Sequence, residues 1–88
     1  MNETEFRQRA ADLGYGQAQV KEYPPNQSGE LHSHDFSAFA MVAGGEFILE
    51  FDDGEVTYRP GDSCEVAAGT RHCEKTGSAG ATVWFATK

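Results

Sequence analysis

The stretch GELHSHDFSAFAMVAGGEF, residues 29–47, contains two histidines one position apart within a largely apolar run. The chain of 88 residues has three histidines in all, and two of them, His32 and His34, lie here. Side chains two positions apart in an extended strand project to the same face, so both imidazoles are placed to reach a single ion. The third histidine, His72, is distant in sequence and joins them only if an antiparallel barrel brings its strand alongside.

The residues around this run have the composition of short strands separated by turn residues. Strands are expected at residues 17–23, 32–43, 46–51, 55–59, 63–67, 71–76 and 81–87, with turns rich in glycine, proline or aspartate between most of them. Roughly seven or eight short strands, with turn residues about every 8 to 12 positions, are typical of an antiparallel sandwich or barrel. The sequence therefore predicts an all-β fold.

The first residues differ from the rest, because they have the pattern of a short helix. Asn2 or Thr4 is suited to cap it, and Glu5 follows Asn2 by three positions, in register for a capping box. One apolar face and a terminating glycine complete the pattern, with Phe6, Ala10, Leu13 and Gly14 in these positions. We expect this helix to act as a lid across one end of the barrel.

The length of the chain allows one domain, residues 1–88, with the helix and its lead-in over 1–15 and the β-barrel over 17–88. So short a chain has a thin core, which a bound metal or a partner subunit is expected to support. The N-terminus is polar and carries acids, unlike a signal or transit peptide, and no apolar run approaches the roughly 20 residues that span a membrane. We therefore expect a cytoplasmic location, with Cys64 and Cys73 reduced.

The charge of the chain argues against nucleic acid as a partner. Fourteen acidic residues against seven basic ones give a net charge of -7. The basic residues are scattered singly along the chain, whereas phosphate binding needs a basic patch. We expect neither a nucleic-acid nor a membrane partner.

The strand expected at residues 32–43 is apolar on both of its faces. Its even positions carry Phe36, Ala38, Ala40 and Val42, and Phe39 and Met41 stand between them. A barrel wall with solvent outside should alternate between apolar and polar residues. The outer face must therefore be covered by the terminal segments or by a second subunit. We expect the second subunit, in a symmetric homodimer.

The histidines also fit two motifs of a known family. In the pattern G(x)5HxH(x)3-4E(x)6G, the matching residues are His32, His34 and Gly45, and in G(x)5PxG(x)2H(x)3N they are Gly61, Gly69 and His72. On these motifs, and over nearly all of the chain from about Val20 to Phe85, the sequence resembles the cupin superfamily. The resemblance implies a double-stranded β-helix, the RmlC-like jelly roll, with a metal ion on the three histidines. The short N-terminal helix followed by one small barrel also looks like a group of compact bacterial cupins with no assigned reaction.

One departure from the family pattern affects the chemistry. The glutamate of the first motif should fall at position 38 or 39, which are Ala38 and Phe39, so the usual carboxylate ligand is absent there. Among nearby acids, Asp35 should face away from the histidines, and Glu46 and Glu50 lie beyond a glycine pair and have no assigned orientation. Three neutral imidazoles would leave the charge of a divalent ion uncompensated, which favours a small anionic ligand. The remaining departures, Asn26, Ala67 and Thr76, affect the shape of turns.

The sequence therefore predicts a metal-binding small cupin with a divalent ion on His32, His34 and His72. The expected ion is zinc, iron, nickel or manganese, because histidine ligands alone do not select among these metals. No fourth histidine is left for acid–base work, so any catalysis would be metal-centred, as in a metal-dependent dioxygenase or isomerase, on a small anionic substrate. A non-catalytic module that binds a small molecule or senses a metal is the alternative. A metal-free barrel with vestigial histidines is a third interpretation.

Four other residues have interior or pocket interpretations. We expect Cys64 to face the interior as a small buried hydrophobe and Tyr58 to be a core aromatic, with a pocket hydroxyl as its other interpretation. Trp84 and Phe85 are adjacent on the last strand, so one should face inward and the other outward.

Overall fold

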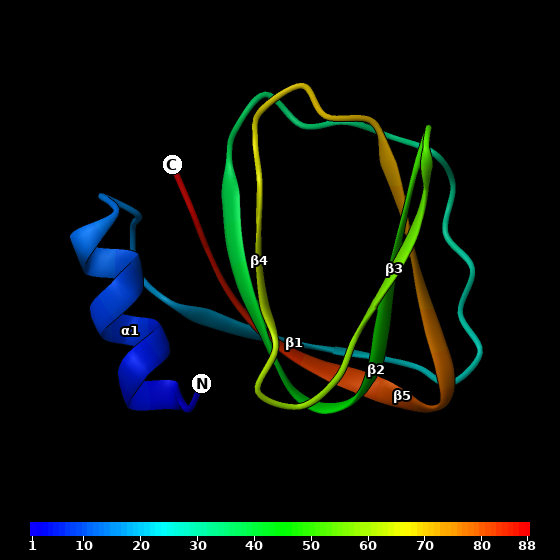
Figure 1. Cartoon of the computed structure of the whole chain (residues 1–88), viewed down its shortest axis with the longest axis horizontal. Helices are drawn as coiled ribbons and strands as arrows, with labels where there is room; N and C mark the ends of the chain where they lie inside the picture. Colours follow the sequence, from blue (N-terminus) through cyan, green and yellow to red (C-terminus); the bar gives the residue numbers. More distant parts are fainter.

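The computed structural model describes residues 1–88 and contains one helix and five strands. These are α1 (Glu3–Asp12), β1 (Gln19–Tyr23), β2 (Ala38–Phe51), β3 (Gly54–Tyr58), β4 (Ser63–Val66) and β5 (His72–Thr87). Figure 1 shows the strands arranged as a ring around an interior, with α1 outside the ring. The prediction of an all-β fold with a short N-terminal helix is confirmed.

Two long strands form the frame of the structure. β2 and β5 pair antiparallel, from Ala38 opposite Thr87 at one end to Phe51 opposite His72 at the other. The first half of β2 also pairs with β4 and its second half with β3, while β1 pairs with the second half of β5. The long pair is therefore bordered by different strands in its two halves, which curve around a common interior (Figure 1).

The long strands bend where they contain glycine. The β2–β5 register shifts between Val42 and Gly44 and again between Gly45 and Phe47. The shift reverses which alternate residues face inward, so β2 turns its even-numbered residues to the interior up to Val42 and its odd-numbered ones from Phe47 on. A bulge of this kind bends a strand without ending it.

These bends correct two of the predicted strand boundaries. The glycine pair at 44–45 and the segment 77–80 were expected to separate strands, but β2 and β5 continue through them, so the structure has five strands instead of seven or eight. The strand expected at residues 32–43 also begins later, at Ala38. The residues between β1 and β2 pair with β5 only through two isolated bridges, Ser28 with Lys75 and His32 with His72.

The helix has the cap that the sequence predicts. The Asn2 side chain accepts a hydrogen bond from the backbone N–H of Glu5 at 2.8 Å, and the Glu5 carboxylate accepts one from the Asn2 N–H at 3.0 Å. Phe6 and Ala10 are buried, and Gly14 follows the helix with a φ of 82°. At ten residues, α1 lacks the length and apolar character needed to cross a bilayer.

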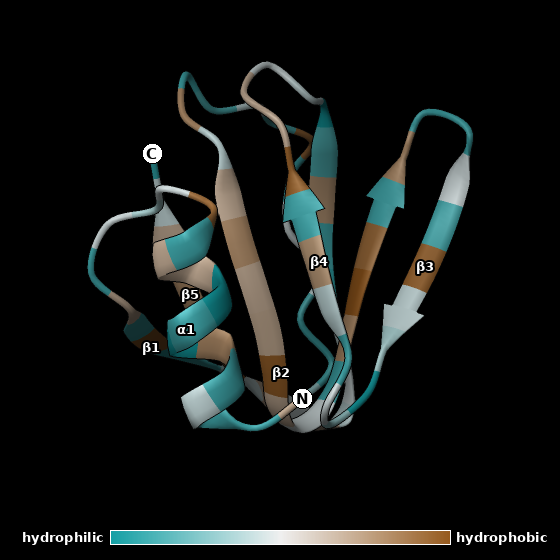
Figure 2. Ribbon diagram, turned by 60° about the vertical axis from the view of Figure 1, so that its left-hand side comes forward, coloured by the Kyte–Doolittle hydropathy of each residue, from teal (hydrophilic) through white to brown (hydrophobic).

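The position of α1 differs from the predicted lid. The helix packs against the outer face of the barrel wall, where its Phe6 ring stacks on Phe39 with centroids 5.0 Å apart. Met41, Tyr15 and Ala86 belong to the same buried cluster. Figure 2 shows β2 coloured as hydrophobic along most of its length, with α1 beside it. The chain's own helix thus covers Phe39 and Met41, the outward-facing residues of the strand that suggested a second subunit. The homodimer stays a prediction, but the apolar outer face of β2 no longer supports it.

A second apolar cluster lies inside the ring of strands. It consists of Val42, Phe47, Leu49, Ala81 and Val83. The barrel wall therefore has an apolar layer on each side, one sealed by α1 and the other facing the interior. The inner layer forms much of the lining of the site described below.

The close approach of the two bends gives a first prediction. A Cβ atom at Gly45 would lie 2.0 Å from the carbonyl oxygen of Gly80, and the φ of Gly45 is 72°. We expect Gly45→Ala to lower the free energy of unfolding by about 4 kcal/mol, because the clash is with backbone that has no room to move. Urea denaturation followed by circular dichroism measures this loss.

Gly14→Ala is the matched control for this substitution. Its φ of 82° is similar, but a Cβ atom there has nothing within 4 Å, so only the left-handed conformation is penalised. We expect a cost of about 1 kcal/mol. Equal losses in the two variants would contradict the role assigned to the contact between the bends.

Candidate functional site

The backbone brings the two histidine segments together at one end of the barrel. His32 and His72 exchange both of their backbone hydrogen bonds, each with an N–O distance of 2.9 Å. The backbone N–H of Gly69 donates to the carbonyl of His34 at 2.8 Å, and that of Ala68 donates to the Ser37 hydroxyl at 3.1 Å. The turn before β5 is therefore fixed against the segment that carries His32 and His34.

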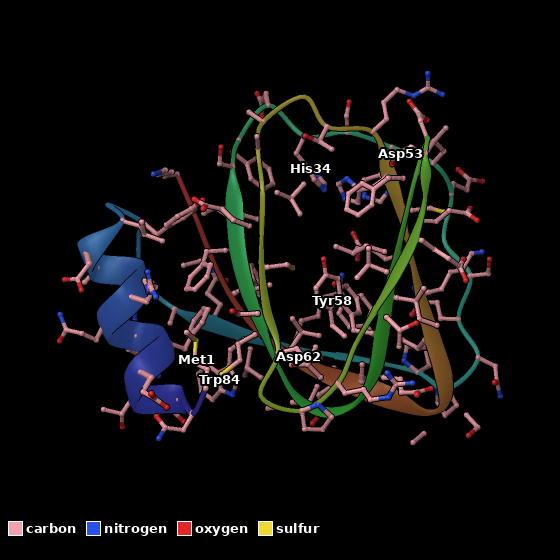
Figure 3. The ribbon with its side chains drawn as sticks, viewed as in Figure 1. Met1, His34, Asp53, Tyr58, Asp62 and Trp84 are labelled. Carbon is pink, nitrogen blue, oxygen red and sulfur yellow. The ribbon has the colours of Figure 1, made fainter.

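The three predicted histidines converge. The ring centroids of His32 and His34 lie 4.8 Å apart, those of His32 and His72 4.6 Å, and those of His34 and His72 5.5 Å. His72 is buried, and the other two are partly exposed. Figure 3 shows His34 within the ring of strands. The expectation that His32 and His34 project side by side and meet His72 is confirmed as geometry.

A carboxylate that the sequence analysis did not consider completes the group. Glu74 lies two residues after His72 on β5 and faces the same side, and one ligand atom from each of His32, His34, His72 and Glu74 lies within 4.8 Å of the others. Glu74 Oε1 is 3.1 Å from His32 Nε2 and 3.7 Å from His72 Nε2. The expectation of a site without a carboxylate is therefore corrected. The spacing rule that paired His32 with His34 also applied to His72 and Glu74.

The Nδ1 atoms of His32 and His72 each contact a backbone carbonyl, and these contacts fix the tautomers of the two rings. Nδ1 of His32 is 2.7 Å from the Glu30 carbonyl oxygen, and Nδ1 of His72 is 2.9 Å from that of Thr70. Because a carbonyl only accepts, each Nδ1 must carry the hydrogen, which leaves Nε2 with the lone pair in a neutral ring. Both Nε2 atoms then face Glu74 Oε1, which is also an acceptor. A proton or a metal cation between these atoms is needed to make the arrangement favourable.

The third imidazole is held by stacking. The ring of His34 lies 4.6 Å from that of Phe36, at an interplanar angle of 23°. Phe36 is among the residues that line the interior cavity, and its side chain is partly exposed at 37%. The Phe36 ring therefore orients His34 and forms an apolar rim beside the histidine group.

Tyr23 orients the carboxylate from the other side. Its hydroxyl donates to Glu74 Oε2 at 2.8 Å, which leaves Oε1 directed at the histidines. Burial is the main cause that raises the pKa of the Tyr23 phenol, and the negative charge of Glu74 is the second. The hydroxyl therefore stays protonated and acts as a donor. Tyr23 was not a candidate from the sequence. Its contact depends on the bend in β5, since Tyr23 pairs with Ala81 and Glu74 lies before the bend.

His34, His72 and Glu74 lie in the wall of a cavity of about 270 Å³, and His32 contacts the Glu74 carboxylate without being one of the lining residues. Its lining is mainly apolar. Both long strands contribute to it, β2 with Ala38, Ala40, Phe47 and Leu49, and β5 with Val83 and Phe85. Lys21 and Glu74 are the charged side chains among the lining residues. An apolar cavity with a few convergent polar groups at one place is the usual form of a small-molecule site.

The other acids near the motif do not join the group. Asp35 is exposed, Glu46 pairs with Arg59 at 3.2 Å, and Glu50 pairs with Lys75 at 3.1 Å. Cys73 donates to Glu50 with an S–O distance of 3.2 Å, so it faces away from His72, in agreement with the alternation of the strand.

The remaining interior candidates lie as the alternation predicts. Cys64 lines the cavity and hydrogen-bonds with Tyr58, which lies in the interior in Figure 3. Phe85 faces the cavity, whereas Trp84 faces outward and packs against the helix side of the wall. Burial raises the pKa of the Cys64 thiol to about 11, and the hydrogen bond with Tyr58 opposes part of that rise.

The family model of the cupin domain matches residues 19–87. The chain belongs to the cupin domain family. A comparison with curated proteins finds no match.

Solved structures of three other proteins share the fold. A protein of unknown function from Rhizobium leguminosarum bv. viciae 3841 is 18% identical at a TM-score of 0.72, with 99% of this chain and 95% of that chain covered. An RmlC-like cupin from Shewanella frigidimarina NCIMB 400 is 22% identical at a TM-score of 0.68, with 81% and 64% covered. The DMSP lyase DddQ from Ruegeria pomeroyi DSS-3 is 18% identical at a TM-score of 0.73, with 81% and 36% covered.

These similarities show a shared fold and not a shared activity. The present chain spans about a third of the lyase and nearly two thirds of the RmlC-like cupin. The prediction of a cupin jelly roll is confirmed by the family match and by these structures.

The environment of Cys64 gives a prediction with a defined pH dependence. In a Cys73→Ala variant, iodoacetamide should alkylate Cys64 about a hundredfold more slowly at pH 8 than in the urea-unfolded chain, because only the thiolate reacts and the raised pKa lowers its fraction. Mass spectrometry of quenched samples gives the rates. The rate in the folded protein should keep rising to about pH 11, the pKa of the partly buried thiol. A plateau near pH 9, as for an unfolded thiol, would contradict burial of Cys64 in the cavity wall.

Proposed function

We propose that this protein is a metal-binding small cupin in which His32, His34, His72 and Glu74 hold one divalent ion beside the interior cavity. The observation that carries the proposal is the convergence of four potential ligand atoms within 4.8 Å of one another. Two of the histidines direct lone-pair nitrogens at a single carboxylate oxygen, and a cation between them would relieve that repulsion.

The surroundings of the four groups also suit a metal. Ligating histidines usually donate their second ring N–H to a carbonyl or carboxylate, as His32 and His72 do, and ligating carboxylates are usually hydrogen-bonded, as Glu74 is by Tyr23. Three imidazoles and one carboxylate accommodate zinc, iron, nickel or manganese. An ion that takes six ligands would keep positions free for a small molecule, whereas a tetrahedral ion would be saturated by these four.

The bound molecule is proposed to be small and anionic. Glu74 balances one of the two charges of a divalent ion, and no other carboxylate lines the cavity. The excess positive charge, in a mainly apolar surrounding, favours an anion. The DMSP lyase among the similar structures is named for a reaction of a small molecule, which supports a ligand of that size.

The proposed role of the site is metal-centred chemistry on this anion. A divalent ion supplies Lewis acidity to an oxygen atom of a bound molecule. The residues of this chain hold the ligand set in place through the contacts of Tyr23, Glu30 and Thr70, and the apolar wall excludes water from the reacting group.

A non-catalytic binding module is the second candidate, and one observation favours it. Tyr23 is committed to Glu74, and the pKa of Cys64 is raised to about 11, so neither is suited to carry protons near neutral pH. Oxygen uptake and product formation with a panel of small carboxylates and diketones separate the two candidates. Binding without turnover across the panel would favour the module.

Metal binding is tested on protein purified without a histidine tag. Wild-type protein should bind one equivalent of a divalent ion, and Glu74→Gln and His72→Ala should each weaken binding by at least about a hundredfold, more than the loss of an outer contact costs. Elemental analysis gives the stoichiometry, and titration against a chelating dye gives the affinity. Glu50→Gln, on the outer face of the barrel wall, should bind as the wild type does.

Two results would overturn the metal site. One is a wild-type protein that takes up no zinc, iron, nickel or manganese. The other is a Glu74→Gln variant with unchanged affinity, which would mean that the carboxylate contacts the histidines without sharing their ligand.

The contact of Tyr23 with Glu74 gives a separate prediction. Tyr23→Phe removes the donor to Oε2 and should lower metal affinity about tenfold, because the carboxylate is no longer oriented. Tyr58→Phe is the control, since the Tyr58 hydroxyl lies against Cys64 and not against Glu74. The same dye competition measures both variants. A loss as large in Tyr58→Phe would mean that the effect comes from the interior packing in general.

A further inference from the structure

One charged residue of the cavity has no role in the proposed metal group. Lys21 is an exposed residue of β1 that also lines the cavity, and it makes no ion pair with any carboxylate of the chain. Most of the other basic side chains have partners on the chain: Arg7 with Glu3, Arg59 with Glu46, Lys75 with Glu50 and Glu55, and Lys88 with the Leu13 carbonyl. Arg9 and Arg71 also have no ion pair, so Lys21 is distinguished by being the one lysine or arginine that lines the cavity.

Lys21 lies close to the histidine group. Its ammonium is over the ring of Tyr23, 4.7 Å from the centroid, and the hydroxyl of the same ring contacts Glu74. One aromatic ring therefore separates the lysine from the proposed ligand set. The cavity lining as a whole is mainly apolar.

We propose that Lys21 binds the carboxylate of a two-ended ligand, whose other end supplies an oxygen to the metal group. This inference rests on the proposed metal site and names the class of molecule that it takes. A single ammonium can neutralise a single carboxylate, and the cavity lining contains no arginine to make the bidentate contacts that phosphate often receives.

The size of the cavity limits the ligand. A volume of 270 Å³ corresponds to about nine water molecules, at about 30 Å³ for each. A molecule that lies wholly within this volume would have about nine non-hydrogen atoms. A short apolar chain with an acid at each end, of the length of succinate or glutarate, meets the three requirements of size, apolar middle and two anionic ends.

The experiment compares acids of equal carbon number on cobalt-loaded protein. Calorimetry should show that succinate binds more tightly than butyrate, or glutarate more tightly than pentanoate, by about tenfold, the effect expected of one charge-assisted contact. Lys21→Met should abolish this preference while cobalt stoichiometry and affinity stay unchanged. Lys21→Arg should retain most of it.

Lys88→Met is the matched control. The Lys88 ammonium also lies over a tyrosine ring, 4.5 Å from the centroid of Tyr15, but on the helix side of the barrel wall. The variant should keep the preference of the wild type for the diacid. A loss in Lys88→Met equal to that in Lys21→Met would point to a general charge effect and overturn the inference.

Cobalt binding and the preference for diacids distinguish a failure of the Lys21 inference from a failure of the metal site. Wild-type protein that binds no cobalt would overturn the metal site, and the Lys21 inference with it. Wild-type protein that binds cobalt but does not prefer either diacid would overturn the Lys21 inference alone. A preference that persists in Lys21→Met would do the same.

Discussion

The site is organised around one carboxylate oxygen. Oε1 of Glu74 is approached by Nε2 of both His32 and His72, and the Nδ1 atoms of both rings are already committed to backbone carbonyls. With neutral imidazoles, acceptors face one another across a gap of 3.1 to 3.7 Å. Such an arrangement is costly when it is partly buried and becomes favourable when a cation lies at its centre. The contacts of Glu30, Thr70 and Tyr23 keep the groups from turning away.

The barrel wall makes this geometry possible by using both of its faces. Large side chains, Phe39 and Met41, point outward and are sealed by α1, whereas the small Ala38 and Ala40 point inward and leave space. A close-packed interior would have no room for a ligand, so the distribution of large and small residues along β2 creates the cavity. The glycine bends then curve the same strand around it.

Much of this was predictable from the sequence, and the omissions have physical reasons. The convergence of the three histidines followed from a spacing of two and from the cupin motifs. The capping box at Asn2 followed from local chemistry. The covering of Phe39 by α1 did not, because alternation along a strand shows that a face is apolar but not what covers it. The bends at glycine were mistaken for strand ends, since the same residues favour both.

Glu74 and Tyr23 were missed for different reasons. The carboxylate was sought at the position of the family motif, although His72 and Glu74 are two apart on one strand and share a face. That signal was present in the sequence. Tyr23 depends on the pairing of β1 with the far half of β5 and on the bend between, and no local pattern carries that information.

Anomalous diffraction from crystals grown with manganese or cobalt tests the central claim most directly. The account predicts one strong peak within bonding distance of Nε2 of His32 and His72, a ring nitrogen of His34 and Oε1 of Glu74, with the Tyr23 hydroxyl still on Oε2. A protein whose peak lies elsewhere, or whose Glu74 remains bonded directly to His32 with no ion between them, would contradict it.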